Sequence, residues 1–530
     1  MRITNNIILH NTSNNINGNK INVDNLNNQM SSQKKIQRPS EDPVIAIRAL
    51  RLRSSLSEID QYYEKNIPDA ESWLDVTETA ILNMKDILTT IRTQCEYGAN
   101  DSLTTDNRKT ILTQLEKLRE QVYSEGNADY AGRTVFTGYR TNKKLTFMEN
   151  ELTTSYKISQ KLSYSSIEEH RYYGNDVEVP KKDDILPNPN PTPVPDPVSA
   201  TFDRIRLPYD GIDSITVTDD ITGDETAVAA NGATVVIDYS YEDANGATQT
   251  NGALTVTIYD TYDSWLAASG NGVYEVAANG AVFIKDTGEL ILGTDASATL
   301  KSSKAELDFN YTKTGFDRGE LRPEYYFNCT NVTDPANHIT YEKYDAEGNE
   351  IYQDINYMVA ANQTITVNTN ASDVFDASLG RDVDELIDAV QRSLDANQTV
   401  EDIQAMMKQE QYSSDECQAK LEEWLAAAQK EADYADDNMQ KLYNSYIGKC
   451  DKYLEKVNLA LTEVGSKGQS LELTKNRMSN QQTTIEELKS TNEDRDLSDI
   501  IIDYTSAYTA YQASLQAASM INQVTLLSYL

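Results

Sequence analysis

The chain has few of the side chains that metal sites and redox sites use. Its 530 residues include four cysteines and three histidines. No cysteines form a CxxC pair and no histidines have HExxH spacing, so a zinc site or a redox motif has no support. We therefore expect buried free thiols and no metal. The residues concerned are Cys95, Cys329, Cys417, Cys450, His10, His170 and His338.

Catalytic and nucleotide-binding motifs are also missing. The sequence contains no GxGxxG, no GxxxxGK followed by Ser or Thr, and no GxSxG. Paired carboxylates are numerous because the chain is acidic, and a solvated surface explains them better than an acid–base pair. We predict that the protein is not an enzyme and holds no cofactor.

Long apolar runs are absent. The start, MRITNNIILHNTSNN, lacks the continuous apolar segment and the small-residue cleavage site of a secretory signal. Residues 497–530 are long enough to span a bilayer, but polar residues such as Gln512, Ser519 and Asn522 are spread around the expected helix. We predict neither a membrane span nor a cleaved signal peptide.

Positive charge is scarce. There are 47 Lys and Arg residues against 83 Asp and Glu residues, which gives a formal net charge of −36. Such a chain should repel nucleic acid and anionic membranes. Both ends depart from this pattern, because residues 1–30 carry only Arg2, Lys20 and Asp24, and residues 497–530 carry only Asp499 and Asp503. Nearly neutral ends suit segments that pack against copies of themselves.

Apolar residues at the two ends recur with helical spacing. At the C-terminal end, the steps alternate between four and three, which places the residues on one stripe of a helix. At the asparagine-rich N-terminal end, a sparse heptad row recurs every seven residues. We predict an N-terminal segment that is disordered in the monomer and becomes helical when the C-terminal stripe covers it. The predicted assembly interface contains Leu9, Ile16, Val23, Met30, Leu497, Ile501, Tyr504, Tyr508, Tyr511, Leu515 and Ala518.

Long helices are expected between these ends. One should run from about residue 44 to residue 65 and is interrupted by Pro68. A second should run from about residue 68 to residue 96. A shorter helix includes Leu421 and Trp424. The longest regular signal is a row at intervals of seven, which predicts a coiled-coil helix of about fifty residues. That row contains Tyr443, Cys450, Val457, Val464, Leu471, Met478 and Ile485.

The middle of the sequence has a different composition. Residues 187–197, PNPNPTPVPDP, form a stiff linker. Alternating apolar and polar runs follow to about residue 300, and a weak alternation precedes them at 176–179. Asn-Gly pairs favour tight hairpin turns. The pairs begin at Asn231, Asn245, Asn251, Asn271 and Asn279.

The predicted fold class is α+β with several domains. N-terminal and C-terminal parts form a long antiparallel helical bundle or coiled coil, and an all-β domain is inserted in the middle. Residues 1–40 form an assembly helix that pairs with a second one at 497–530. Residues 41–186 and 301–496 form a helical body with β-hairpins, and 187–300 form the linker and the β-rich domain.

The ends of the chain resemble the flagellin-like axial proteins of the bacterial flagellum, most closely the hook-associated type at the hook–filament junction. The resemblance covers roughly residues 1–150 and 430–530. It is carried by MRITNNIIL, LNNQMSSQKKIQRPSEDPVIAIRALRLRSSL, GRTVFTG, LEKVNLALTEVGSKGQSLELTKNRM, DLSDIIIDYTSAYTAYQASLQAASMINQ and LLSYL. Where the family usually has a glycine before KKI, this chain has Gln33, so the geometry of that turn is in question.

The resemblance implies a structural protein that leaves the cell through the flagellar type III export channel. A chaperone would bind its C-terminal helical region before export. Copies would then assemble as a ring between the preceding hook-associated protein and the first flagellin, with no nucleic-acid or membrane partner. The site of action would be the extracellular flagellum.

Two alternatives remain open. The first is flagellin itself, the filament subunit. The second, from another class, is a surface adhesin whose β-rich module binds a ligand such as a carbohydrate through Tyr259, Tyr262 and Trp265.

Overall fold

The computed structural model describes residues 5–100, 103–186, 192–218, 225–242, 248–269, 273–345 and 348–523. The chain divides into two compact units, which are described separately. Unit 1 contains residues 1–71, 356–365 and 468–530. Unit 2 contains residues 72–355 and 366–467. Both units therefore combine segments from distant parts of the sequence, and the helices α3 and α10 contribute residues to each.

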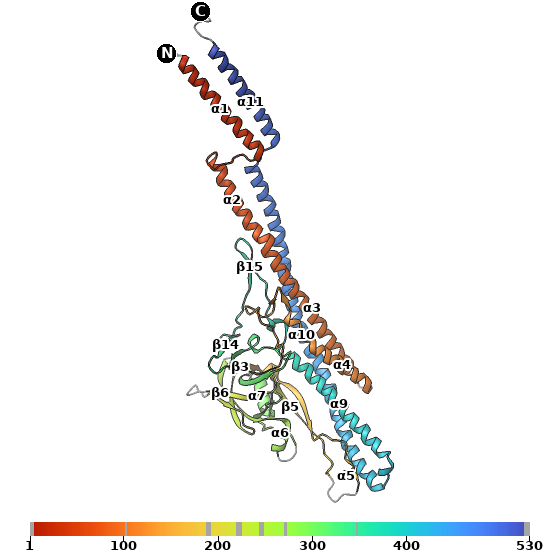
Figure 1. Ribbon diagram of the computed structural model, residues 1–530. Helices are drawn as coiled ribbons and strands as arrows, with labels where there is room; N and C mark the ends of the chain where they lie inside the picture. The colour runs from red at the N-terminus through yellow and green to blue at the C-terminus, as the bar shows by residue number, and fades with distance from the viewer. Residues whose placement is uncertain are drawn as a thin grey trace, which may run out of the picture. The chain divides into compact units, whose positions relative to one another are not determined.

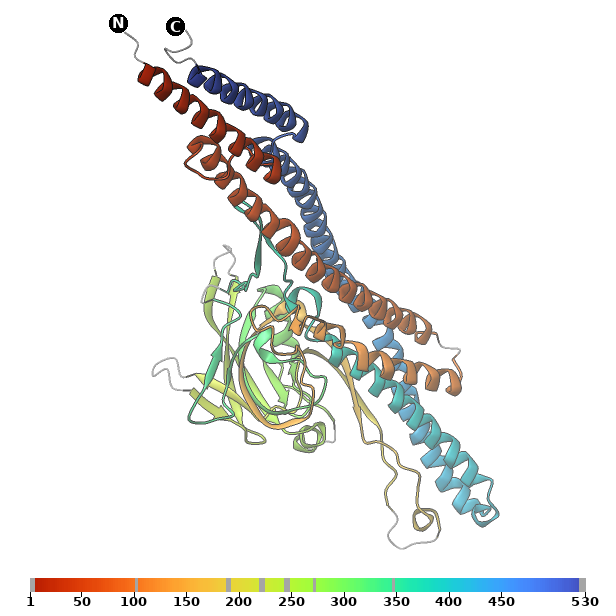
Figure 2. The same cartoon turned by 45° about the horizontal axis from the view of Figure 1, so that its top comes forward.

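Unit 1 consists of helices and one β-hairpin. The terminal helices α1 and α11 lie side by side in both ribbon views (Figures 1 and 2). The hairpin consists of β15 and β16. The elements are α1 (Asn5–Ser32), α2 (Pro43–Asp60), the π-helix η1 (Gln61–Asn66), the start of α3 (Ile67–Gly98), β15 (Asn356–Ala360), β16 (Gln363–Thr366), the last part of α10 (Asp415–Glu493) and α11 (Leu497–Gln523).

The expected break at Pro68 does not occur. Helical backbone continues from α2 through η1 into α3, whose second residue is Pro68. A proline inside a helix lacks one N–H donor, and its ring clashes with the carbonyl four residues earlier. The π-helical turn at Gln61–Asn66 widens the backbone directly before the proline, and such turns are a known cause of local helix distortion. We infer that η1 accommodates Pro68 without ending the helix.

The heptad row in α10 is confirmed. Its first six residues, from Tyr443 to Met478, are at most 3% exposed, and Ile485 is partly buried. The helix is longer than expected, because α10 has 79 residues and includes the segment around Trp424 that was predicted as a separate helix. No proline or glycine lies between Leu425 and Tyr443 to end it.

The helices of unit 2 pack in pairs. In both ribbon views α3 and α9 run alongside α10, and Arg92 of α3 forms an ion pair of 2.7 Å with Asp451 of α10. The helices are the remainder of α3 and of α10, together with α4 (Thr105–Gln121), α5 (Lys182–Ile185), α6 (Tyr262–Ala268), α7 (Thr294–Ser302), α8 (Ala371–Val374) and α9 (Leu379–Met407). Short 3-10 turns are η2 (Glu125–Asn127), η3 (Tyr164–Ser166), η4 (Pro323–Tyr325) and η5 (Glu410–Tyr412).

A large sheet forms the rest of unit 2. Within the described residues it has 12 strands, in the order β14-β13-β3-β12-β8-β9-β10-β11-β5-β4, with β6 on β12 and β7 on β6. Pairing is antiparallel except between β9 and β10. The strands are β3 (Glu151–Ser163), β4 (Glu168–Gly174), β5 (Val198–Arg206), β6 (Ser214–Thr218), β7 (Glu225–Val228), β8 (Thr234–Glu242), β9 (Thr248–Tyr259), β10 (Gly280–Ile284), β11 (Glu289–Leu292), β12 (Glu306–Phe316), β13 (Asn328–Asn331) and β14 (Ile339–Tyr341).

The sheet takes in more of the chain than residues 187–300. Strands β3 and β4 come from before the linker, and β12, β13 and β14 come from after residue 300. The 13-residue strand β3 lies between β12 and β13, so its residues are needed to complete the sheet. Residues 176–179 form no strand, and near residue 133 only the two-residue β2 (Arg133–Thr134) forms, paired with β1 (Asp129–Tyr130).

The Asn-Gly pairs are mostly not hairpin turns. Asn231-Gly232 is a tight turn, but it connects β7, which pairs with β6, to β8, which pairs with β9. Asn251-Gly252 lies inside β9, where a Cβ on Gly252 would come within 2.3 Å of the Tyr239 ring. Asn279-Gly280 leads into β10, which runs parallel to its neighbour β9. The pairs at Asn245 and Asn271 lie outside the described residues.

Both faces of the sheet are covered by apolar packing. On one face Phe283 and Phe309 pack with residues of α7, such as Leu300. On the other face Ile284 packs with Trp265 of α6. Strand β10 is therefore buried on both sides and has an unbroken run of buried residues.

Candidate assembly interface

The two terminal helices pair along a heptad seam in unit 1. On α11 the less exposed positions follow steps of four and three, and the same spacing occurs on α1. The helices run antiparallel, because the segment 33–496 leaves from the end of α1 and returns to the start of α11 (Figure 1). The seam residues are Thr12, Ile16, Asn19, Val23, Leu26 and Met30 on α1 and Ile500, Tyr504, Ala507, Tyr511, Ser514 and Ala518 on α11.

The sequence identified half of this seam on each helix. Ile16, Val23 and Met30 lie in it, and the prediction missed Leu26, which is 8% exposed. On α11 the predicted positions Tyr504, Tyr511 and Ala518 lie in the seam, and the prediction missed Ile500, which is fully buried. Leu26 lies three positions after Val23, and Ile500 lies four positions before Tyr504, as in a two-helix coiled coil. That spacing was the available signal.

The other predicted residues of α11 remain largely uncovered. Leu497, Ile501, Tyr508 and Leu515 are 41%, 47%, 44% and 43% exposed, respectively. The last three each follow a seam residue by one position, so they form a second stripe beside the seam. We call these four residues the outer stripe. The seam itself uses smaller residues at the matching turns, Ala507 and Ser514, and leaves the larger side chains outside.

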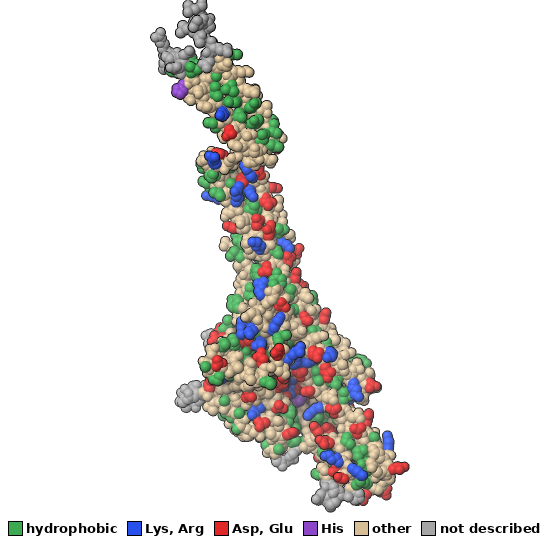
Figure 3. Space-filling model, in the orientation of Figure 1, with side chains coloured by type: hydrophobic (Ala, Val, Ile, Leu, Met, Phe, Trp, Pro, Cys, Tyr) green, Lys and Arg blue, Asp and Glu red, His purple; other side chains and the backbone are tan. Residues whose placement is uncertain are grey.

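Helix α1 also keeps apolar side chains at its surface. Ile7, Ile8 and Leu9 are 50%, 37% and 38% exposed, so the predicted interface residue Leu9 lies outside the seam. Figure 3 shows green and tan atoms over most of the visible face of α1 and α11, with few charged side chains. Pairing of the two helices therefore does not bury all their apolar surface.

A polar clasp joins the base of this helix pair. The backbone N–H of Lys35 donates to the carbonyl of Glu493 at 2.7 Å, and the N–H of Arg495 donates to the carbonyl of Gln33 at 3.0 Å. The Lys34 ammonium pairs with Asp494. The Glu493 side chain is 5% exposed and receives two hydrogen bonds from Arg53, at 2.8 and 2.6 Å. These hydrogen bonds lower the pKa of Glu493.

Gln33 occupies a strained position in this clasp. Its φ is 54°, in the left-handed region that glycine adopts without penalty. A non-glycine residue pays roughly 1–2 kcal/mol there. The turn expected from a glycine is therefore kept in this chain, because the hydrogen bonds on both sides of Gln33 hold its backbone.

In unit 2 a buried ion cluster ties the sheet to the helices. The fully buried Arg204 of β5 donates to Glu168 of β4 at 2.9 and 3.0 Å and to Glu289 of β11 at 2.8 Å. It also pairs with Glu385 of α9. Removing one partner of such a buried pair costs roughly 3–5 kcal/mol. The cluster therefore fixes the edge of the sheet against α9.

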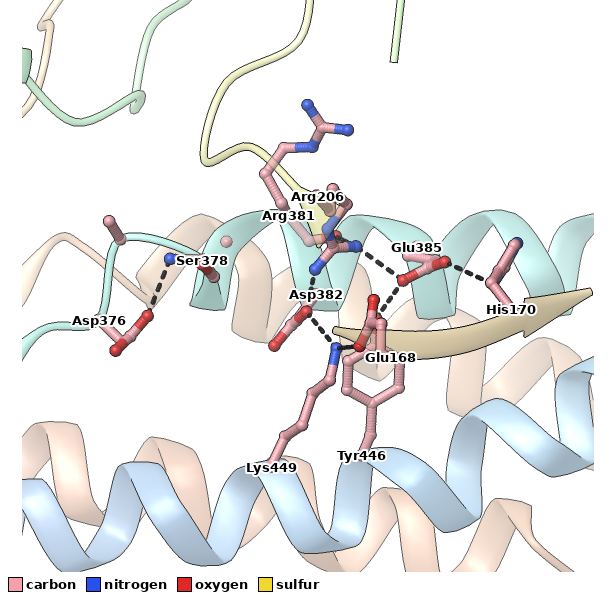
Figure 4. Close-up of polar contacts among 12 residues, drawn as sticks. Glu168, His170, Arg206, Asp376, Ser378, Arg381, Asp382, Glu385, Tyr446 and Lys449 are labelled. Atoms are coloured by element: carbon pink, nitrogen blue, oxygen red, sulfur yellow. Dashed lines mark hydrogen bonds and ion pairs between the residues drawn. The ribbon is translucent and has the colours of Figure 1, made fainter. Parts of the chain in front are cut away.

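Figure 4 shows how α10 joins the same cluster. Lys449 donates to Asp382 of α9 at 3.1 Å and lies 2.6 Å from Glu168 of β4. Tyr446 donates to Glu385. These positive charges lower the pKa of Glu168. Burial alone would raise that pKa, but Arg204, Lys449 and Arg206 lower it to about 2.

His170 borders the cluster and is neutral at pH 7. Burial, followed by the charge of Arg204, lowers its pKa to about 4, although Nδ1 lies 3.3 Å from Glu385. An imidazole that is protonated in the unfolded chain but neutral in the folded one lowers the stability of the fold as the pH falls. The fall begins near the unfolded pKa of about 6.5 and ends near the folded value.

The described residues contain neither a three-residue metal-binding cluster nor a helix apolar enough to span a membrane. Within the described residues, no three His, Cys, Asp or Glu side chains lie together so that they could hold a metal ion. All four cysteines are buried and free. In the described part of the chain, helices of membrane-spanning length lack the necessary apolarity.

Comparison with known families matches both ends of the chain. Residues 3–141 match the bacterial flagellin N-terminal helical region, and residues 447–530 match the bacterial flagellin C-terminal helical region. The chain is flagellin-like at both ends. The two matches contain the whole of α1 and α11, and so all the residues of the seam and the outer stripe.

Curated relatives of these flagellin-like ends carry one name. The flagellar hook-associated protein 3 of Salmonella typhimurium is 29% identical over 117 residues, which is 22% of this chain and 37% of that protein. The flagellar hook-associated protein 3 of Escherichia coli is 31% identical over 120 residues, 21% of this chain and 36% of that protein. The chain thus matches about a third of the length of these relatives.

A solved structure of the same name overlaps most of the chain only loosely. The flagellar hook-associated protein-3 from Legionella pneumophila is 9% identical, covers 83% of this chain and 97% of its own, and has a TM-score of 0.29. That score is too low to carry an argument about the fold. The described strands of the large sheet, from β3 to β14, all lie outside both matched regions, so the matches assign them no role.

Proposed function

We propose that the protein is a structural component of the bacterial flagellum and acts as an adaptor at the hook–filament junction. The support is the flagellin-like character of both ends, together with relatives named flagellar hook-associated protein 3. The role is structural rather than enzymatic. In the proposal, copies assemble as a ring that connects the hook to the flagellin filament.

The outer stripe is the observation that carries this proposal. Four large apolar side chains on α11 stay about half exposed after α11 has paired with α1. Burying a Leu or Ile side chain completely stabilises by about 1.5–3 kcal/mol, so a partner helix would gain about half of that at each position. A sister molecule that brings its own α1 and α11 supplies such a helix, and its near-neutral surface adds little repulsion.

The stacked tyrosines of α11 fit the same purpose. Tyr504 of the seam and Tyr508 of the outer stripe have ring centroids 6.0 Å apart and an interplanar angle of 10°. An aromatic pair that reaches from the inner seam to the outer surface can bind a third helix without rearrangement. Seam and outer stripe then form one continuous surface for assembly.

The remaining partners follow from the family resemblance. The ring would lie between the preceding hook-associated protein and the first flagellin. An export chaperone would cover the C-terminal helical region before assembly, when the outer stripe has no partner. The protein would reach the extracellular flagellum through the flagellar export channel.

A strain without the protein separates this role from that of the filament subunit. Loss of a junction adaptor should leave hooks in place and release flagellin monomers into the medium. Loss of flagellin itself should leave capped hooks and no free flagellin. The second outcome would overturn the adaptor role in favour of the filament subunit.

A further inference from the structure

Two of the four cysteines lie on neighbouring helices of unit 2. Cys95 belongs to α3 and Cys450 to α10, and they are 0% and 2% exposed, respectively. In both ribbon views α3 runs alongside α10 (Figures 1 and 2). We propose that these two cysteines form a disulfide bond when the chain folds in an oxidising solution. Such a bond joins the part of the chain before the large sheet to the part after it.

Two contacts between α3 and α10 set the register of these helices. The Nε atom of Arg92 lies 2.7 Å from Oδ1 of Asp451. Further along α3, Gly98 faces Tyr443 so closely that a Cβ on the glycine would come within 2.4 Å of the tyrosine ring. Residue numbers rise along α3 while they fall along α10, so the two helices run antiparallel. The two cysteines lie between these contacts, each on its own helix.

Both cysteines occupy the packed face of their helix. Cys95 follows the buried Ile91 by one helical turn, and Cys450 belongs to the buried heptad row of α10. A hydrogen bond with Cys450, followed by burial, raises the pKa of Cys95. Helices with small side chains at their contact pack at the short end of the usual range of roughly 8–10 Å between axes. Facing residues there can meet the limit of about 7 Å between Cα atoms that a disulfide requires.

The other two cysteines have different surroundings. Cys329 of β13 lies in the core of the sheet, together with Tyr311 of β12. Cys417 lies near the start of α10 in a separate apolar cluster, and its Sγ atom is 3.6 Å from the carbonyl oxygen of Ile185. Among the described residues, each of these two clusters contains a single cysteine. The fold therefore selects one pair of thiols.

The chemistry is thiol–disulfide exchange with a small disulfide such as glutathione disulfide. The thiolate of one cysteine attacks that disulfide and releases one glutathione thiol, and the thiolate of the second cysteine attacks the mixed disulfide and releases the other. Two protein thiols lose two electrons and two protons, and the two glutathione thiols receive them. Because the thiolate is the attacking species and burial disfavours it, the exchange takes place before α3 and α10 have fully packed.

The setting for this reaction rests on the proposed function. Disulfides persist outside the cell and are rare in the reducing cytosol. In the proposed role the folded chain lies outside the cell, so the bond persists there once it has formed. The pairing of the two thiols, in contrast, rests on the packing of α3 against α10 within unit 2.

The test uses the full-length chain in solution. The wild type is unfolded in urea with dithiothreitol and refolded either with glutathione disulfide and glutathione or with dithiothreitol. Free thiols are counted in denaturant after an acid quench, and the cross-link is located by peptide mass spectrometry. After oxidising refolding we expect two of the four thiols to remain free and one cross-linked peptide pair, which contains Cys95 and Cys450. The thermal midpoint should exceed that of the reduced protein by roughly 5 °C or more.

Matched variants separate this pair from the other thiols. Cys95→Ala and Cys450→Ala should lose both the cross-link and the rise in the thermal midpoint. The controls Cys329→Ala and Cys417→Ala also remove a buried thiol, but they should keep both. Four free thiols in the refolded wild type, glutathione bound to the protein without a cross-link, or a cross-link between another pair would overturn the proposal. These results would leave the adaptor role untouched, because that role rests on the flagellin-like ends of the chain.

Discussion

Replacing Leu515 by Asp should abolish assembly and leave the free subunit nearly unchanged. Leu515 is 43% exposed, and complete coverage by a neighbour would gain that share of the 1.5–3 kcal/mol for a leucine, about 1 kcal/mol. An aspartate buried at the same contact would be an unpaired charge, which costs roughly 3–5 kcal/mol. The combined loss of about 4 kcal/mol or more per contact corresponds to roughly a thousand-fold in affinity.

The control is Ala513→Asp on the same helix. Ala513 is exposed and lies about 120° around the helix from Ile501, away from the outer stripe. Both variants introduce the same charge into the same exposed helix, and each should change the stability of the free subunit by about 0.5 kcal/mol. The comparison therefore isolates the contact made by the outer stripe.

The assay measures incorporation and stability separately. Each variant is expressed in a strain that lacks the protein, and the chain is quantified in sheared flagella and in the medium. The account predicts that Leu515→Asp is found only in the medium and Ala513→Asp in the flagella, with similar thermal midpoints for the two purified subunits. Normal incorporation of Leu515→Asp, or equal loss for both variants, would refute the reasoning.

Three further predictions concern the body of the protein. Gln33→Gly should raise the unfolding free energy by about 1 kcal/mol in urea titrations, because it removes the left-handed strain; destabilisation would show that the Gln33 side chain matters more. His170→Gln should flatten the pH dependence of stability, because the pKa of His170 is about 4 in the folded chain and about 6.5 in the unfolded one. Wild type should lose about 3 kcal/mol as the pH falls between those values, and an unchanged profile in the variant would contradict the assignment. Ellman's reagent should react with none of the four buried thiols until the chain unfolds, and fast labelling of any thiol in the native subunit would contradict their burial.

Sequence periodicity predicted the helices well where one face is buried throughout. The row from Tyr443 to Met478 was identified because every seventh residue faces a neighbouring helix, and a heptad pattern records that directly. The stop at Pro68 was wrong, because the rule that proline ends a helix assumes regular α-helical backbone. Here a π-helical turn precedes the proline, so the backbone is not regular α-helix at that point. The local composition gives no signal from which such a turn could be predicted.

The β-rich part could be predicted only in outline. Strands such as β6 and β8 follow from alternation, but their partners do not, because β3 and β12 are separated by more than 140 residues and still pair along most of their length. The Asn-Gly pairs were a poor guide to hairpin turns. Gly252, for example, lies inside a strand, and a Cβ at that position would clash with the Tyr239 ring. The ion cluster around Arg204 could not be predicted at all, because α9 and β4 meet only in the folded chain.

Helix α11 shows that periodicity alone does not decide which of two neighbouring stripes is buried. Tyr504, Tyr511 and Ala518 are compatible with either Ile500 or Ile501 as neighbours on the helix surface. Sequence alone favoured the larger residues Ile501, Tyr508 and Leu515. The folded chain places the smaller ones in the seam, and the larger ones remain available for another molecule.

The most direct test is hydrogen–deuterium exchange of residues 497–520 in the free subunit and in assembled flagella. If sister molecules cover the outer stripe, these amides should exchange quickly in the free subunit and become strongly protected on assembly. Full protection already present in the free subunit, with no change on assembly, would contradict the account.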